Sequence, residues 1–216
     1  SKFPEITLMS DVAMDPYSSD GHDGLVRNGE IINDETLPIL AKMAVAQADA
    51  GVDIIGPSDM MDGRIGFIRN SLDDNGFIDT SLMSYTAKYA SAFYGPFRDA
   101  LDSAPKSGDK KTYQMDPRNC KEALREAELD VIEGADILMV KPAMCYLDVI
   151  NQLNQSFDLP ISAYNVSGEY AMIHAAAQKG WLDYEKSMIE TLTSIKRAGA
   201  SIILTYFAKD FASLEN

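Results

Sequence analysis

The chain has 216 residues, a formal net charge of -14 at pH 7, 46% hydrophobic residues and 24% charged residues. This composition is ordinary for a globular domain, and the acidic balance argues against a nucleic-acid partner, because phosphates attract basic surfaces. No apolar run approaches the ~20 residues of a membrane span, and the N-terminus has no signal-peptide pattern. We therefore expect no membrane partner and a cytoplasmic location. Cys120 and Cys145 alone cannot build a disulfide framework or a zinc site.

A recurring order of helix, glycine and apolar run organises the sequence. Gly51, Gly134 and Gly199 each follow a helical stretch and precede an apolar run, and glycine is the expected residue just past a helix. Apolar runs without alternation are typical of parallel strands that are covered on both faces. The predicted strands lie at residues 6–10, 53–56, 82–85, 137–140, 161–164 and 202–205. The predicted helices lie at residues 34–50, 117–133, 146–155, 169–179 and 184–198.

Six such βα units indicate an α/β fold, either a (β/α)8 (TIM) barrel or an open doubly wound sheet. A closed barrel needs eight strands and about 250 residues, so the chain is about two units short of one.

The longest stretch without periodicity, residues 93–114, is predicted to be a lid or binding loop. It carries Arg98, Lys106, Lys110 and Lys111. In an acidic protein this basic island could close on a carboxylate, although a solvated loop would have the same composition.

Lysines follow two consecutive predicted strands. Lys141 directly follows the apolar run at 137–140, and Lys88 follows the strand before it. An amine at the mouth of an apolar barrel loses hydration and can lie near a second cation, and both effects lower its pKa. A neutral amine attacks a ketone or aldehyde to form a Schiff base. One such lysine fits a class I aldolase, and two fit an enzyme that binds two carbonyl substrates; snorkelling to solvent is the alternative for each.

The loop after the first strand is rich in aspartate, with Asp11, Asp15, Asp20 and Asp23. Clustered oxygen ligands suit Mg²⁺ better than zinc. A solvated turn of the same composition is the alternative.

Long segments of the chain resemble porphobilinogen synthase, the 5-aminolevulinate dehydratase family. They are PSDMMDGRIG (57–66), MSYTAKYASAFYGPFRDA (83–100), GDKKTYQMDP (108–117), EGADILMVKPAMCYLD (133–148), VSGEYAM (166–172) and LTYFAK (204–209). The resemblance implies a TIM-barrel lyase that condenses two molecules of 5-aminolevulinate to porphobilinogen in tetrapyrrole (haem and chlorophyll) biosynthesis. Residues 1–216 would form a single barrel domain with the last six βα units, without the N-terminal arm and the first two units. The full-length protein would be a homo-octamer.

The resemblance also implies roles for individual residues. Lys141 matches the lysine that forms the Schiff base with the P-side substrate, and Lys88 matches its A-side counterpart. Ser167 and Tyr206 match the pair that binds the P-side carboxylate. The other matches are Arg98, Lys110 and Gln114 at the A-side carboxylate, Tyr94 and Phe97 as lid and pocket aromatics, and Asp11 and Ser58 around the P-side substrate.

The metal ligands implied by the resemblance depend on a departure from the zinc-dependent pattern. Zinc-dependent members carry three cysteines at the positions of Ala13, Asp15 and Asp23, where this chain has none. It therefore resembles the aspartate-rich, zinc-independent branch, with Asp15 and Asp23 as candidates for an active-site metal. An allosteric Mg²⁺ is expected on Glu126, with Asp59 reached through water. No zinc and no organic cofactor are expected.

Two alternatives to this function stay open. One is a class I aldolase on the same barrel, although no glycine-rich phosphate loop follows Tyr206. The other is a non-catalytic barrel remnant, which would have no use for two strand-end lysines.

Overall fold

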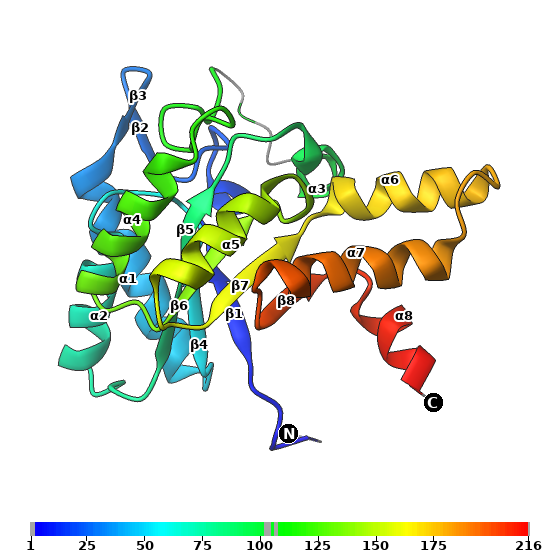
Figure 1. Ribbon diagram of the computed structural model, residues 1–216. Helices are drawn as coiled ribbons and strands as arrows, with labels where there is room; N and C mark the ends of the chain where they lie inside the picture. The colour runs from blue at the N-terminus through cyan, green and yellow to red at the C-terminus, as the bar shows by residue number, and fades with distance from the viewer. Residues whose placement is uncertain (1–2, 102–104, 106–107, 216) are drawn as a thin grey trace.

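The computed structural model describes residues 3–101, 105 and 108–215, in which helices surround a six-stranded parallel sheet (Figure 1). The strands are β1 (Met9–Val12), β2 (Leu25–Arg27), β3 (Glu30–Ile32), β4 (Ile54–Pro57), β5 (Ser81–Lys88), β6 (Ile137–Lys141), β7 (Ile161–Asn165) and β8 (Ile202–Thr205). The helices are α1 (Asn33–Asp49), α2 (Arg64–Asp74), α3 (Gly95–Leu101), α4 (Lys121–Ile132), α5 (Leu147–Ser156), α6 (Ser167–Gln178), α7 (Tyr184–Ala198) and α8 (Ala208–Ala212). Short 3-10 turns occupy Asp15–Tyr17, Ala92–Tyr94, Met144–Tyr146 and Ser213–Glu215.

The strand order decides between the two predicted architectures. The sheet runs β1-β4-β5-β6-β7-β8, and every neighbouring pair is parallel. A doubly wound sheet reverses its strand order at a switch point, whereas this order follows the chain throughout. The structure is therefore the predicted α/β barrel architecture with six βα units.

Both faces of the sheet are apolar, as the non-alternating strands predicted. The outer face packs against the helices through residues such as Leu82, Leu138 and Ala163, which share one buried cluster with residues of α1, α2, α4 and α5. The inner face carries a second cluster that includes Met83, Tyr85, Ile137 and Met139. Because catalytic groups of such sheets collect at the carboxyl ends of the strands, the inner cluster is the floor beneath any site there.

An irregularity in β5 changes which face its last residues occupy. Ser84 pairs with Leu138, but Ala87 pairs with Val140, so β5 uses one residue more than β6 over this interval. A bulge of this kind shifts the alternation of side chains by one position. Leu82 and Ala87 consequently both lie in the outer cluster, although they are five residues apart, and Lys88 becomes the register partner of Lys141.

Several element boundaries differ from the predictions for local reasons. The first strand is β1 (Met9–Val12) rather than residues 6–10, because pairing begins only after Leu8, whose carbonyl accepts hydrogen bonds from Asp53 and Ile54. The fourth helix begins at Lys121 rather than at residue 117. There the Asp116 and Asn119 side chains accept backbone hydrogen bonds and hold a turn. The 184–198 helix and the 202–205 strand are confirmed.

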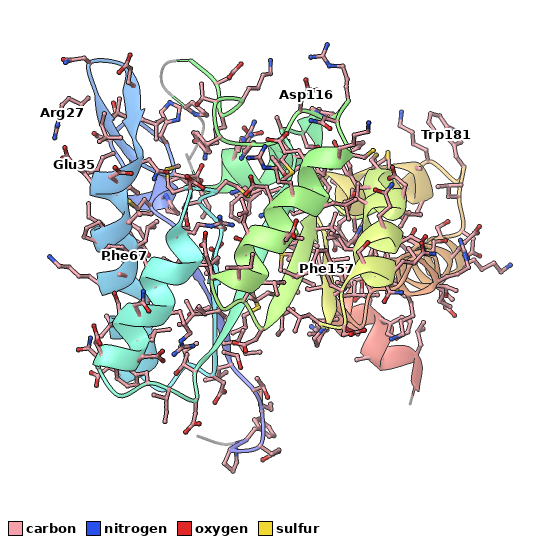
Figure 2. The ribbon with its side chains drawn as sticks, turned by 60° about the vertical axis from the view of Figure 1, so that its left-hand side comes forward. Arg27, Glu35, Phe67, Asp116, Phe157 and Trp181 are labelled. Atoms are coloured by element: carbon pink, nitrogen blue, oxygen red, sulfur yellow. The ribbon has the colours of Figure 1, made fainter. Side chains whose placement is uncertain are left out.

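Four elements were not predicted: α2, α3, α8 and the antiparallel β2–β3 hairpin. The hairpin is joined by Asn28 and Gly29, both with positive φ (53° and 83°). An Asn-Gly pair between short apolar stretches is a hairpin signal that was available in the sequence. Figure 2 shows Arg27 of this hairpin beside Glu35 of α1, with which it forms an exposed 2.6 Å ion pair.

The α6–α7 pair projects away from the sheet (Figure 1). Trp181, in the connection between these helices, lies at the far tip of the projection and is 73% exposed (Figure 2). No helix in the described part of the chain is long and apolar enough to cross a membrane.

Candidate active site

A pocket lies at the carboxyl ends of the strands. The N-terminus lies at the opposite end of the sheet (Figure 1). The pocket is lined by Asp15, Lys88, Tyr94, Phe97, Arg98, Lys110, Gln114, Lys141, Tyr164, Val166, Ser167 and Tyr206. Both predicted catalytic lysines and most of the predicted substrate-binding residues therefore meet in one pocket, although they are spread over more than half of the sequence.

Lys141, the last residue of β6, has its amine in a box of aromatic rings. The distances from Nζ to the ring centroids are 4.4 Å for Tyr164, 5.3 Å for Tyr85, 5.5 Å for Tyr94 and 5.7 Å for Phe97. Burial, followed by the positive charge of Lys88, lowers the pKa of Lys141 from 10.5 to about 8. Both predicted causes of a lowered pKa therefore act on Lys141, and a useful fraction of its amine is neutral near pH 7.

Lys88 has a more polar environment than its register partner. Its amine is buried, donates a hydrogen bond to the Ser58 carbonyl and lies 3.7 Å from Asp23 Oδ1. Strand bonding continues beyond it, because the Lys88 carbonyl accepts a hydrogen bond from Met115 N. Neither lysine snorkels to solvent. One faces aromatic rings and the other faces a carboxylate and a carbonyl.

Lys110 connects the lid to the aspartate loop. Its buried amine lies 3.0 Å from Asp15 Oδ2 and 2.9 Å from Asp23 Oδ2. Although burial opposes ionisation of Asp23, the Lys88 and Lys110 ammonium groups and a hydrogen bond from Tyr113 together lower its pKa. Asp23 is therefore the shared counter-ion of the two lysines.

Asp15 and Asp23 were predicted as ligands of an active-site metal. Both carboxylates instead face the Lys110 ammonium, and a divalent cation between them would lie close to Lys110 and Lys88. Within residues 3–101, 105 and 108–215, no group of three or more His, Cys, Asp or Glu side chains is arranged to hold a metal. The residues present do not fit a metal at this position.

The first half of the lid is hydrogen-bonded to residues at the carboxyl ends of β5, β6 and β7 or just beyond them. Phe97 N donates a 3.1 Å hydrogen bond to Ser167 Oγ, and the Tyr94 hydroxyl donates to the carbonyls of Tyr89 and Lys141. A Cβ atom on Gly168 would lie 2.4 Å from the Phe93 carbonyl oxygen, so glycine permits this close approach. The predicted Lys106 lies outside the described residues.

The remaining predicted pocket residues offer polar groups to a ligand. Arg98 lies with its guanidinium 5.3 Å from the Tyr94 ring centroid. Gln114 Oε1 is buried and has no hydrogen-bond partner in the described part of the chain. An unpaired buried acceptor is costly, so a ligand donor at Gln114 would be strongly favoured. Tyr206 is 42% exposed at the pocket rim beyond β8.

Five predicted residues lie outside the pocket lining, and one of them is Asp23, which contacts the lining residues Lys88 and Lys110. Ser58 is buried and reaches the site through its carbonyl, which accepts from Lys88. Asp11 lies on β1 at the edge of the sheet; its carboxylate is hydrogen-bonded to the Ser58 side chain near Lys141, and burial raises its pKa. Asp59 is buried behind Ser58, where it accepts a 2.7 Å hydrogen bond from Met61 N. Glu126 lies on α4, in the layer of helices outside the sheet, and does not line the pocket.

Two lining residues were not predicted, Tyr164 and Val166. Tyr164 is on β7, where its register partner is Leu204, and its ring is the one closest to Lys141 among the four. Its position at the end of a predicted strand was a signal for a pocket residue, because strand ends line the site in this architecture.

Comparisons with known proteins identify relatives of the chain. The profile of the family described as Delta-aminolevulinic acid dehydratase matches residues 1–214. The chloroplastic delta-aminolevulinic acid dehydratase of Physcomitrium patens is 66% identical over 208 residues, which are 96% of this chain and 48% of that protein. The delta-aminolevulinic acid dehydratase of Bradyrhizobium diazoefficiens is 60% identical over 96% of this chain and 59% of its own length.

A solved structure is also similar throughout. The crystal structure of delta-aminolevulinic acid dehydratase from Toxoplasma gondii, in complex with the reaction product porphobilinogen, has a TM-score of 0.97 and 56% identity. The match covers 99% of this chain and 61% of that one. The chain thus spans about half the length of the curated relatives that it matches. On the profile match and these identities, the chain belongs to the delta-aminolevulinic acid dehydratase family.

Proposed function

We propose that the protein containing this chain is a lyase that condenses two molecules of 5-aminolevulinate to porphobilinogen, a step of tetrapyrrole biosynthesis. The observation that carries the proposal is the pair of register-matched lysines in one pocket, Lys88 and Lys141. A single-lysine aldolase has no use for the second amine, and a non-catalytic remnant has no use for either, because buried amines are costly.

Lys141 would form the first Schiff base. Its neutral amine attacks the ketone carbon of one substrate, and the carbonyl oxygen leaves as water. A pKa of about 8 instead of 10.5 raises the free-amine fraction at pH 7 from about 0.03% to about 9%. The aromatic rings around the amine keep out water that would hydrolyse the imine.

Lys88 would hold the second substrate in the same way. Neighbouring parallel strands lie about 4.8 Å apart, so two register partners present two imines side by side. Two covalent tethers make formation of the carbon–carbon and carbon–nitrogen bonds an effectively intramolecular step.

The carboxylates of the two substrates require donors at the pocket wall. Ser167 and Tyr206 would bind the carboxylate on the Lys141 side, and both line the pocket. Arg98, Lys110 and Gln114 would bind the carboxylate of the second substrate, on the Lys88 side. Lys110 would first have to exchange Asp15 for the substrate.

The zinc-independent subtype is part of the proposal. It is supported by the absence of cysteine at Ala13, Asp15 and Asp23, and by the two ammonium groups beside Asp23. The proposed reaction needs no active-site metal, because the two lysines form both Schiff bases.

The proposal includes a distant Mg²⁺ at Glu126 instead. Burial and the charge of Asp130 raise the pKa of Glu126, so a cation beside it would relieve repulsion between carboxylates. Asp59 Oδ2 is buried without a hydrogen-bond partner among the described residues, and Mg²⁺ characteristically keeps several waters that could reach such a group. Glu126 would hold the ion directly and Asp59 through water, and the ion would supply positive charge that stabilises one assembly of the subunits.

A homo-octamer and a cytoplasmic location complete the proposal. The plant relatives are named chloroplastic and the Bradyrhizobium relative is not, so imaging of the tagged full-length protein is the test of compartment. Sedimentation with and without Mg²⁺ tests the assembly.

The activity is tested by borohydride reduction in the presence of 5-aminolevulinate, followed by peptide mapping. We expect reduced adducts on Lys141 and Lys88, and porphobilinogen without added zinc. Lys141→Met should abolish turnover, whereas Lys179→Met, which removes a surface lysine beside the Trp181 ring, should leave it unchanged. Turnover that survives Lys141→Met would refute the assignment.

A further inference from the structure

Tyr113 links the end of the lid to the aspartate loop through its hydroxyl. The oxygen lies 2.9 Å from Asp23 Oδ2, 3.1 Å from His22 Nδ1 and 3.3 Å from Asp23 N. His22 and Asp23 are both buried. These contacts join residues that are 90 or 91 positions apart in the sequence.

The hydrogen-bond directions follow from the donors that are available. Burial and the Asp23 carboxylate raise the pKa of Tyr113, so the phenol keeps its single proton. Asp23 is ionised and can only accept, so the Tyr113 proton is donated to it. The Tyr113 oxygen must then accept from His22, which requires the proton on Nδ1.

Asp23 is held on one side by these contacts and faces Lys88 on the other. Its Oδ2 accepts from both Tyr113 and Lys110, at 2.9 Å each. Its Oδ1 is thereby turned toward Lys88 Nζ, 3.7 Å away. Without the Tyr113 hydrogen bond, Lys110 would be the remaining side-chain partner of Asp23 Oδ2. The Asp23 carboxylate could then rotate together with the Lys110 side chain.

We propose that Tyr113, supported by His22, is a positioning residue for Lys88: it fixes the Asp23 carboxylate that orients this amine for the second Schiff base. The inference rests on the proposed function, in which Lys88 holds one of the two substrates. Tyr113 does not line the pocket as described, so it acts through Asp23 and not on substrate.

Lys141 provides an internal reference for this inference. The rings around its amine are those of Tyr164, Tyr85, Tyr94 and Phe97, and no hydrogen bond or ring pair among the described residues joins them to Tyr113. The charge of Asp23 also acts on Lys141, but less than burial, Lys88 and Asp11 do. A change that only disturbs Asp23 should therefore alter the two lysines unequally.

The test compares the two adducts in Tyr113→Phe, made in the protein at its full natural length. Hydrogen bonds to charged groups are worth enough to change an equilibrium about tenfold. We expect the reduced 5-aminolevulinate adduct at Lys88 to fall about tenfold, with the Lys141 adduct within about twofold of its original level and kcat reduced more than KM is raised. Tyr184→Phe is the matched control, because Tyr184 donates to Asp210 away from the pocket.

Each outcome is decisive. An unchanged ratio of the two adducts in Tyr113→Phe, or an equal fall of both, would overturn the inference and leave the proposed function standing. Absence of both adducts from the unsubstituted protein would overturn the proposed function and this inference with it.

His22 variants separate positioning from packing. Asparagine places an N–H donor where Nδ1 lies, so His22→Asn should retain the normal adduct ratio. Glutamine places its donor nearer the Nε2 position, so His22→Gln should lower the Lys88 adduct. A normal ratio in both variants would remove His22 from the inference.

Discussion

The lowered pKa of Lys141 predicts how its reactivity changes when Lys88 loses its charge. Burial is the largest cause of the lowering and Lys88 is the next. Lys88→Met removes the second cause while keeping a side chain of similar length. We expect the pKa of Lys141 to rise from about 8 to about 9, which corresponds to about 1.4 kcal/mol.

The sign follows from the reactive form of the amine. Only the neutral amine attacks the ketone, so adduct formation at Lys141 increases as the pH rises through its pKa. With a pKa of about 9, the free-amine fraction at pH 7 falls from about 9% to about 1%. The initial rate of adduct formation should therefore fall about tenfold at pH 7 and approach that of the unsubstituted protein well above pH 9.

The assay is the initial rate of the borohydride-reduced 5-aminolevulinate adduct at Lys141, measured as a function of pH in both proteins. Lys179→Met controls for the loss of one positive charge elsewhere, because Lys179 is exposed and lies 4.9 Å from the Trp181 ring centroid. A midpoint near 10.5 in the unsubstituted protein would refute the burial argument. An unmoved midpoint in Lys88→Met would refute the coupling of the two amines.

Two further predictions test the framework of the site. Arg64 is buried, lies 3.8 Å from Asp59 and 3.9 Å from Asp130, and donates to the Tyr85 carbonyl. Arg64→Met should lower the free energy of unfolding by about 3–5 kcal/mol, because breaking a buried pair leaves charge uncompensated. Arg27→Met, in an exposed pair, should cost far less, because solvent screens exposed ion pairs. Denaturant titration measures both, and equal costs would contradict the reasoning. Gly168→Ala places a Cβ 2.4 Å from the Phe93 carbonyl oxygen, so it should displace the lid and raise KM for 5-aminolevulinate about tenfold. Gly95→Ala should leave KM unchanged, because there is open space around its Cβ. The same KM for both variants would contradict the role given to the Gly168 contact.

Two features of α2 show why it was missed from the sequence. Ile65, Ile68 and Leu72 are spaced for one buried helix face, but Gly66 and several polar residues interrupt the apolar pattern. The glycine is explained only by a tertiary contact, since a Cβ there would lie 3.3 Å from Glu133 Cγ. Helix propensity was overridden by packing against another element.

Local sequence patterns were enough to predict the βα organisation and the chemistry of the strand ends. Hydrophobic runs and following glycines report burial and helix ends, which are local properties, and they located the six sheet strands to within a few residues. The position of Lys141 after an apolar run already indicated a desolvated amine. The family resemblance then named pocket residues that the structure brings together.

Which side chains face one another depends on long-range packing, which local sequence patterns do not report. The bulge in β5 makes Lys88 the partner of Lys141, and hydrophobic periodicity cannot report register between strands. Likewise, Lys110 lies between Asp15 and Asp23, and Tyr113 reaches His22, across about 90 residues of sequence. Such contacts depend on how distant segments pack, and that packing assigned ammonium groups to carboxylates that the sequence alone had suggested for a metal.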